Sequence, residues 1–337
     1  MRIDPANIGK RMVVRSIVAG FGPSGGPAMT DVVGRVLAVD DSQVTVERRD
    51  GSTVDVALAA VVAAKIVPSS PARSRRAQAI SSDDLTRITS RGWPAPVSEL
   101  LGEWELRAAG GFTGRANSVA VHGVPGMTFA KAIARVVSFY QERRLMPLAQ
   151  VVVGSAGEKM FLDAGWSPAV GRPGGAIVQV AELAACPDHE PSFLGHAVVD
   201  DHASDEWLGL YHRVDDPTMA RAVLEGPATV GFLSIGDPIV AIGRVVVTGE
   251  WAGLACVEVA PHARRQGLAT LIVDESIAWA RKRGADKAYL QTMTDNAEAI
   301  ALYAPYGFRT HHEYVYLEPV SRPPNVIENE PSAPLSL

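Results

Sequence analysis

One stretch of the sequence, residues 257–270, combines residue types that can bind an anion. It reads Val-Glu-Val-Ala-Pro-His-Ala-Arg-Arg-Gln-Gly-Leu-Ala-Thr, so a strand ends, a proline turn follows and a glycine-bearing loop opens a helix. Such a loop directs several backbone N–H groups at one point, where the helix dipole adds about half a positive charge. Gly267 and Ala269 let the backbone approach a ligand closely, and Arg264 and Arg265 add positive charge. The stretch predicts a phosphate or pyrophosphate site, although it lacks the glycine patterns of dinucleotide-binding and Walker loops.

A second block of spaced residues follows at 296–308. It has the pattern Asn-x-x-Ala-x-x-Leu-Tyr-x-x-x-Gly-Phe, and its members are Asn296, Ala299, Leu302, Tyr303, Gly307 and Phe308. Together with the Arg-x-x-Gly-x-Ala motif at 264–269, this block resembles the GCN5-related N-acetyltransferases, which bind acetyl-coenzyme A. The spacing between the two blocks leaves room for one helix and one strand, as that fold requires.

The resemblance implies a role for each matching position. Backbone groups of Val257 and Val259 would pair with the pantetheine arm as an added strand would. Asn296 would hold the cofactor near its amide end. Tyr303 would act as general acid for the departing thiolate, or would instead be a core aromatic beneath the last helix. The pyrophosphate would be held by six successive N–H groups, those of Arg265, Gln266, Gly267, Leu268, Ala269 and Thr270.

The catalytic base is open. Some family members use a glutamate on the strand after the pyrophosphate helix, where this chain has Gln291, which cannot act as a base. Glu258 is the best remaining carboxylate; an outward structural role is its alternative, and a water chain to bulk solvent is the fallback. His262 lies in the turn, where we expect it to be exposed. Neither Cys186 nor Cys256 lies in a nucleophile setting, so we expect direct attack by the acceptor rather than an acetyl-enzyme.

The middle region repeats this order of elements without the functional groups. Residues 119–126 replace the strand and loop, and no Arg-x-x-Gly-x-Ala motif follows. The matched pairs are 129–144 with 267–282, 148–153 with 288–293, Phe161 with Tyr303, and Gly154 with Asn296. The middle region is therefore predicted to be a degenerate copy, similar to one half of the tandem acetyltransferases. Arg115 and Asn117 in this copy either face an acceptor or tie the two copies together.

Short strands precede the repeat, within residues 1–67. Apolar and polar residues alternate at 11–15, 32–39, 43–48 and 53–56, with a hairpin turn at 49–52 and a long loop at 22–27. This density of strands favours a small closed barrel that resembles SH3-like barrels. A similar barrel precedes a set of actinobacterial-type acetyltransferases, and the resemblance to that set extends over the chain apart from its tail.

These elements predict an α+β protein, in which tandem mixed sheets with flanking helices follow a small all-β barrel. The predicted parts are the barrel (1–67), a Pro/Ser/Arg-rich linker (68–79), the degenerate copy (80–190), the catalytic copy (191–320) and a disordered tail (321–337).

Composition limits the function classes. The 337 residues are 47% hydrophobic with a net charge of −5, which excludes a disordered chain and argues against whole-protein binding of nucleic acid. Two distant cysteines argue against a disulfide framework or zinc site and fit a reducing cytoplasm. The longest apolar stretch, 54–67, is too short to span a bilayer. The pairs Asp201-His202 and His311-His312 lack a third ligand, so we expect no metal.

We therefore predict a cytoplasmic, acetyl-coenzyme A-dependent N-acetyltransferase, either a monomer or a homodimer. Its acceptor is a primary amine of a small molecule, an amino acid or a protein. The rival hypothesis is a non-catalytic coenzyme A sensor or scaffold whose barrel recruits partners. A third hypothesis, RNA binding by the barrel and the basic residues 73–76, predicts salt-sensitive binding.

Overall fold

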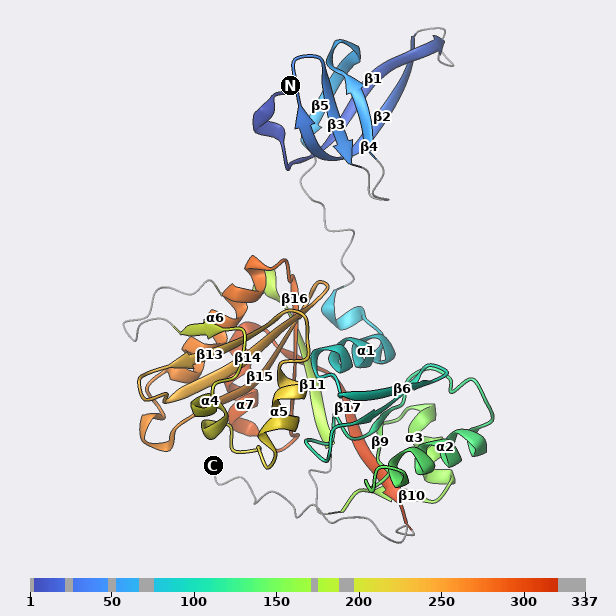
Figure 1. Cartoon of the computed structure of the whole chain (residues 1–337), viewed down its shortest axis with the longest axis vertical. Helices are drawn as coiled ribbons and strands as arrows, with labels where there is room; N and C mark the ends of the chain where they lie inside the picture. Colours follow the sequence, from blue (N-terminus) through green and yellow to red (C-terminus); the bar gives the residue numbers. More distant parts are fainter. Residues whose placement is uncertain are drawn as a thin grey trace. The chain divides into compact units, whose positions relative to one another are not determined.

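The computed structural model describes residues 3–21, 27–47, 53–66, 76–170, 175–187 and 197–320. The chain divides into two compact units, residues 1–74 and 75–337, and each is described by itself (Figure 1). The loop expected at 22–27 apart from its last residue, the turn at 49–52, most of the linker at 68–79 and the tail from 321 lie outside the described residues.

The first unit is an antiparallel sheet of five strands in the order β4-β3-β2-β1-β5. Its elements are η1 (Pro5–Asn7), β1 (Arg11–Phe21), β2 (Pro27–Val39), β3 (Gln43–Glu47), β4 (Thr53–Ala57), η2 (Leu58–Ala60) and β5 (Val61–Ile66). Because successive side chains of a strand point to opposite faces, alternate apolar residues form one core. The buried members are Ile3, Met12, Val14, Val32, Val36, Val44, Val46 and Val56. The predicted small all-β N-terminal domain is confirmed.

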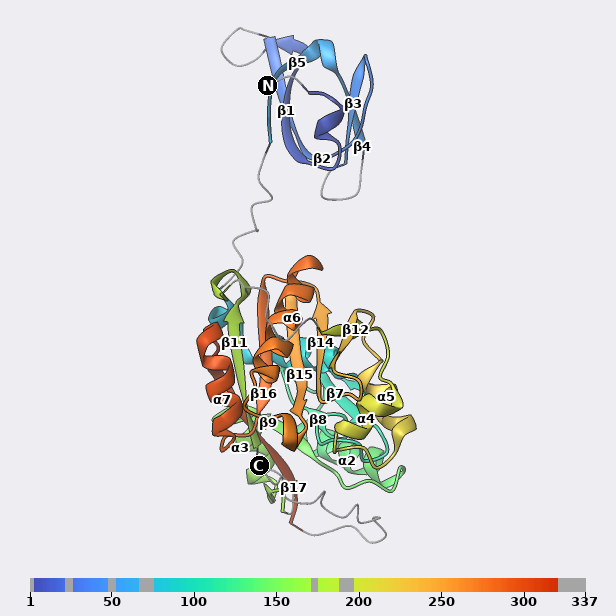
Figure 2. The ribbon, with the colours of Figure 1, turned by 90° about the vertical axis from the view of Figure 1, so that its left-hand side faces the viewer.

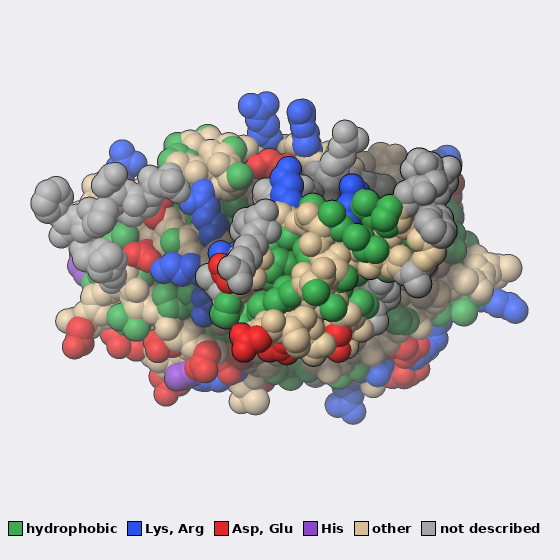
Figure 3. Space-filling view, turned by 90° about the horizontal axis from the view of Figure 1, so that it is seen from above, with side chains coloured by type: hydrophobic (Ala, Val, Ile, Leu, Met, Phe, Trp, Pro, Cys, Tyr) green, Lys and Arg blue, Asp and Glu red, His purple; other side chains and the backbone are tan. Residues whose placement is uncertain are grey.

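Charged side chains of both signs occur on the surface. On the face seen from above, Lys and Arg side chains, Asp and Glu side chains, and hydrophobic ones all appear (Figure 3). On the first unit, Arg15 pairs with Asp31 of the neighbouring strand, at 2.7 Å between Nε and Oδ1. Exposed pairs of this kind contribute little to stability, so the small sheet depends on its apolar core.

The second unit contains a twelve-stranded mixed sheet with helices on its faces (Figures 1 and 2). Its helices are α1 (Ser82–Gly92), α2 (Phe129–Gln141), α3 (Ala156–Asp163), α4 (Asp205–Leu210), α5 (Pro217–Leu224), α6 (Leu268–Lys282) and α7 (Ala297–Tyr303). Its strands are β6 (Val97–Leu101), β7 (Trp104–Ala108), β8 (Val119–Ala120), β9 (Ala149–Val152), β10 (Trp166–Pro168), β11 (Gly175–Glu182), β12 (Val198–Asp200), β13 (Val230–Ile235), β14 (Ala241–Thr248), β15 (Trp251–Val259), β16 (Lys287–Thr292) and β17 (Arg309–Pro319). The predicted mixture of helices and sheet is confirmed.

Short polar residues set where the helices begin. Ser81, Ser155, Ser204 and Asp216 each accept a backbone N–H from the first turn of α1, α3, α4 and α5, respectively. Such caps satisfy N–H groups that have no partner inside the helix. The local sequence therefore determines where these helices begin.

The two halves of this sheet contain the same parallel unit. In the first half, β8 pairs in parallel with β9, and α2 lies between them in the chain. In the second half, β15 pairs in parallel with β16, and α6 lies between them. The order of elements expected from the repeat is present in both halves.

The halves also exchange strands. Strand β11, which the sequence analysis did not identify, follows the first half in the chain but lies between β16 and β17. There Val178 is in register with Gln291 on one side and His312 on the other. Strand β17 in turn pairs with β9 and β10 of the first half. Residues 175–182, which the predicted boundaries assign to the degenerate copy, thus complete the sheet of the catalytic copy.

Helices pack on both faces of the second half of the sheet. Helix α6 contacts β13, β14 and β15, and α1 contacts β14 and β15. A Cβ at Gly243 would lie 2.3 Å from Cγ2 of Ile272, so glycine lets α6 approach closely. The next residue, Arg244, points to the opposite face and donates to a carbonyl of α1. No helix in the described parts of the chain is long and apolar enough to cross a membrane.

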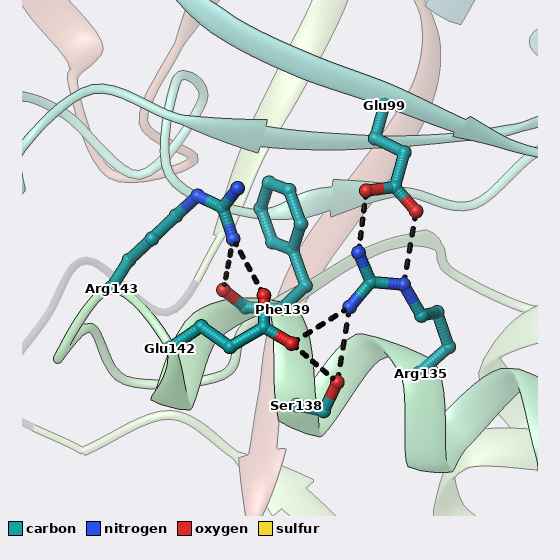
Figure 4. A network of polar contacts seen from close by, with 6 residues as sticks. All are labelled: Glu99, Arg135, Ser138, Phe139, Glu142 and Arg143. Carbon is teal, nitrogen blue, oxygen red and sulfur yellow. Dashed lines mark hydrogen bonds and ion pairs between the residues drawn. The ribbon is translucent and has the colours of Figure 1, made fainter.

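Ion pairs connect α2 of the first half to the strand β6 (Figure 4). Arg135 of α2 donates to Glu99 of β6, at 3.0 Å between Nε and Oε1, and its Nη1 lies 3.3 Å from Oε1 of Glu142. Arg143 donates to the carbonyl of Phe139 and lies over that ring, 3.9 Å from its centroid. The cations of this surface are therefore paired within the first half.

Candidate functional site

An open strand edge lies where β15 separates from β16. The two strands are in register only from Trp251 to Leu254, whereas β15 continues to Val259. Ala260 donates its N–H to Val240 beside β14, so the backbone groups of Val257 and Val259 point to the opposite edge. Val257 and Val259 thus lie at the edge where an added strand could pair, and the carbonyl of Val259 accepts Nε of Arg264 there at 3.3 Å.

A β-bulge bends β15 at the same point. The register with β14 shifts between the pair Ile242–Glu258 and the pair Arg244–Ala255. Cys256, inside the bulge, has a φ of +56°, which is uncommon for a residue other than glycine. The bulge interrupts regular pairing next to the open edge, and such irregularities are frequent beside active sites.

The predicted pyrophosphate loop follows the open edge. The turn η5 (Pro261–Ala263) leads to Arg265 with φ +62° and Gly267 with φ +84°, and α6 begins at the next residue. The first helical acceptor is the carbonyl of Gly267, bonded by the N–H of Leu271, so the N–H groups of residues 268–270 precede the helical bonding. Successive backbone N–H groups at such a turn can form an anion-binding concavity. Arg264, Arg265 and Gln266 are exposed around it.

Tyr303 and Glu258 lie within electrostatic reach of each other. Tyr303 is buried, and its ring packs edge-on against Phe308 at 5.4 Å between centroids. Burial raises the pKa of its phenol above the ordinary value, and the nearby Cys256 and Glu258 raise it further. The phenol therefore stays protonated at neutral pH and is available as a donor.

Glu258 is half-buried on β15. Burial raises the pKa of its carboxyl, and the positive charges of Arg213, His212 and Arg264 lower it in part. A carboxylate with a raised pKa is a stronger base than an exposed one.

Other predicted positions have structural partners. Oδ1 of Asn296 accepts the N–H of Ala299 at 3.0 Å and caps α7. Its counterpart as cap of α3 is Ser155, one residue after the Gly154 that the repeat alignment chose. Oε1 of Gln291 accepts the hydroxyl of Tyr314 at 3.0 Å.

The equivalent of Tyr303 in the first half is a core residue. Phe161 is fully buried among Trp104, Phe129 and Trp166, whose ring centroids lie within 5.5 Å of its own. Asn117 is also structural, because its Oδ1 accepts the N–H groups of Ala109 and Gly111, and its Nδ2 donates to Phe112 and Thr113.

A small pocket, partly open to solvent, lies between α1 and strands β14 to β16. Among its lining residues are Trp93, Arg115, Arg244, Gly253, Tyr289 and Gln291. Sequence analysis missed Trp93, Arg244 and Tyr289. Arg244 left a signal, since it is the one charged residue in the otherwise apolar run 239–247.

The two cysteine thiols are buried, and the histidines considered as metal ligands contact neighbouring side chains. Burial raises the pKa of the thiols of Cys186 and Cys256. His311 and His312 contact each other at 2.8 Å between their Nδ1 atoms, and His202 contacts Asp201 at 2.9 Å. Within the described ranges, no group of three or more His, Cys, Asp or Glu side chains could hold a metal.

Comparisons with known proteins cover both units. A family model described as "Probable histone acetyltransferase Rv0428c C-terminal" matches residues 83–317. A second, described as "Rv0428c N-terminal Sm-like domain", matches residues 6–65. The sequence suggested an SH3-like barrel for this domain, whereas the family description is Sm-like.

Individual relatives give the same assignment. The probable histone acetyltransferase Rv0428c of Mycobacterium tuberculosis is 29% identical over 308 residues, which cover 86% of this chain and 89% of that protein. The uncharacterized N-acetyltransferase YobR of Bacillus subtilis is 25% identical over 243 residues, covering 69% and 96%. A GCN5-related N-acetyltransferase from Kribbella flavida matches with a TM-score of 0.53 at 18% identity, covering 71% and 95%. The chain therefore belongs to the Rv0428c family of GCN5-related acetyltransferases, with an N-terminal Sm-like domain.

Proposed function

We propose that this protein transfers the acetyl group of acetyl-coenzyme A to a primary amine by direct attack in a ternary complex. The proposal rests on how close the predicted cofactor-binding and catalytic residues lie to one another. The anion-binding loop at 264–270 and the open edge of β15 meet beside Tyr303 and Glu258.

The residues present fit the cofactor. The N–H groups of residues 265–270 and the charges of Arg264 and Arg265 suit a pyrophosphate. The edge at Val257 and Val259, which is not paired with β16, suits the amide-bearing pantetheine arm. When bound, acetyl-coenzyme A supplies an acetyl thioester that an unprotonated amine can attack.

Two side chains each carry out one of the proton transfers that the reaction needs. The Tyr303 phenol donates toward the departing sulfur, and the Glu258 carboxylate removes a proton from the attacking amine. The raised pKa of the Cys256 thiol keeps it protonated and therefore weakly nucleophilic, which supports direct transfer.

The test measures coenzyme A release with an amine panel, which includes lysine-bearing histone peptides because of the name of the Mycobacterium tuberculosis relative. Tyr303→Phe keeps the buried ring and is expected to lower turnover roughly a hundredfold or more, with acetyl-coenzyme A affinity nearly unchanged.

Tyr140→Phe is the matched control. Tyr140 is also buried, but it lies in the first half, where its hydroxyl donates to the carbonyl of Arg107 at 3.0 Å, so its loss is expected to cost stability without lowering turnover. Tight cofactor binding with no turnover of any amine would contradict the enzyme proposal and favour the sensor or scaffold hypothesis.

A further inference from the structure

The lining of the pocket beside the bulge of β15 combines apolar residues with side chains that can donate hydrogen bonds. Its eleven lining residues include Arg115 and Arg244 but no Asp or Glu among the described residues. The hydroxyl of Tyr289 occupies the space that a Cβ at Gly92 or Gly253 would need, so these two glycines make room for it. Such a lining suits an anionic ligand group.

Arg244 is a buried and fixed part of this lining. Its side chain is 1% exposed, and its Nε and Nη2 donate to the carbonyls of Leu224 at 2.8 Å and Gly92 at 3.1 Å. These carbonyls belong to the last residues of α5 and α1, where helix dipoles place partial negative charge. Burial lowers the pKa of Arg244 to about 10, so it is still a cation at neutral pH.

The positive charge of Arg115 is not offset in the same way. Its guanidinium carbon lies 4.0 Å from the centroid of the Trp93 ring, and Arg244 lies 4.9 Å from the same ring. Within the part of the chain that the structure describes, Arg115 forms no ion pair. The two helix ends offset Arg244, so Arg115 leaves the pocket with an excess of positive charge.

The pocket also has a defined position relative to the transfer site. Gly253 and Ala255 line it and directly precede the bulge at Cys256 and the open edge at Val257. A ligand with an anionic group in the pocket would therefore have its next few atoms beside the edge where the thioester is expected.

We infer that the acceptor is a small amine bearing a carboxylate a few bonds from its nitrogen, and that Arg115 binds this carboxylate. The inference rests on the proposed function and specifies its substrate class. Arginine suits the role because its planar fork can bind both carboxylate oxygens. Stacking on Trp93 holds the guanidinium plane, which reduces the entropy lost on binding.

The activity experiment compares matched amines with the full chain. Glycine, β-alanine and γ-aminobutyrate are each measured against their amides, with rates expressed per concentration of unprotonated amine. For the carboxylates, Arg115→Gln is expected to raise KM roughly tenfold or more with kcat less affected, and to leave the amides unchanged. Arg115→Lys is expected to restore part of the preference.

Arg283→Gln provides the matched control. Arg283 also stacks on a tryptophan, 3.7 Å from the ring centroid of Trp279, but it is exposed at the end of α6 and does not line the pocket. Its substitution is expected to leave every KM unchanged. Equal turnover of carboxylates and amides by the wild type, or an equal KM increase for both in Arg115→Gln, would overturn the inference.

A binding experiment separates this inference from the proposed function. Calorimetry measures N-acetylglycine, N-acetyl-β-alanine and N-acetyl-γ-aminobutyrate against their amides, with coenzyme A present. Binding that requires the carboxylate and Arg115, without turnover of any amine, supports the pocket and refutes the enzyme proposal. Turnover without carboxylate preference refutes the pocket alone, and the absence of both turnover and binding refutes both.

Discussion

The two halves of the large sheet use the same loop position in opposite ways. In the first half, the loop after β8 donates the N–H groups of Gly123 and Val124 to the carboxylates of Asp83 and Glu103, at 3.0 and 2.8 Å. In the second half, the N–H groups of residues 265–270 lie in the exposed segment 264–267 and in the first turn of α6. The protein's own carboxylates thus occupy N–H groups in the first half, whereas under the proposed function the corresponding groups of the second half bind an external anion.

Aromatic packing follows the same division, whereas charge pairing differs within the first half. Arg135 is bound to carboxylates, and Arg115 lines the pocket between α1 and strands β14 to β16. Phe161 fills an aromatic core, and its counterpart Tyr303 carries a hydroxyl near Glu258. The two halves therefore share an architecture although their side chains differ at these positions, because packing needs only ring volume and satisfied N–H groups.

The largest expected effect concerns the exchange of strands between the halves. A fragment of residues 197–320 lacks β11, so β16 and β17 would each lose a hydrogen-bonded neighbour inside the sheet. We expect this fragment to show no cooperative thermal unfolding by circular dichroism, whereas residues 76–320 unfold cooperatively. A fragment of 197–320 that melts cooperatively and binds coenzyme A would show that the halves are independent.

A smaller effect is expected at the proposed base. Glu258→Gln is expected to lower kcat/KM roughly a hundredfold. Because burial raises the pKa of Glu258, the acidic limb of the wild-type profile should lie above the ordinary range of a glutamate, and the rate should rise with pH through it. The variant should lose this limb. Glu298→Gln, an exposed change on α7, is the control, and an unchanged limb in Glu258→Gln would assign it to another group.

The smallest effects test the two loops directly. Arg264→Gln is expected to raise KM for acetyl-coenzyme A several-fold at low salt and less at high salt, because an exposed charge is screened. Glu103→Gln in the first half is expected to leave that KM unchanged and to lower unfolding free energy by about 1 kcal/mol or less, because the amide can still accept the N–H of Val124 but loses the ion pair with Arg87. Thermal melts measure the change in stability, and initial rates measure the change in KM. A KM change in Glu103→Gln would mean that the first loop also contributes to cofactor binding.

The sequence by itself determined the features that depend on local order. The loop at 264–270, the strand before it, the helix after it and the block from Asn296 to Phe308 are contiguous patterns with their own caps and turns. The loss of the tyrosine at Phe161 could be counted from the nearest glycine. The loop between strand β8 and helix α2 could be recognised as lacking the motif, but the hydrogen bonds of its N–H groups to Asp83 and Glu103 could not be predicted.

Only the tertiary structure decided which distant segments meet. Strand β11 has an ordinary apolar sequence, and nothing in it indicates pairing with β16 and β17 rather than with its own half. The pocket depends on contacts such as that between Arg244 and Gly92, which are 152 residues apart in the chain. Such pairings depend on the total burial and hydrogen bonding of the assembled sheet, a property that short-range residue patterns do not contain.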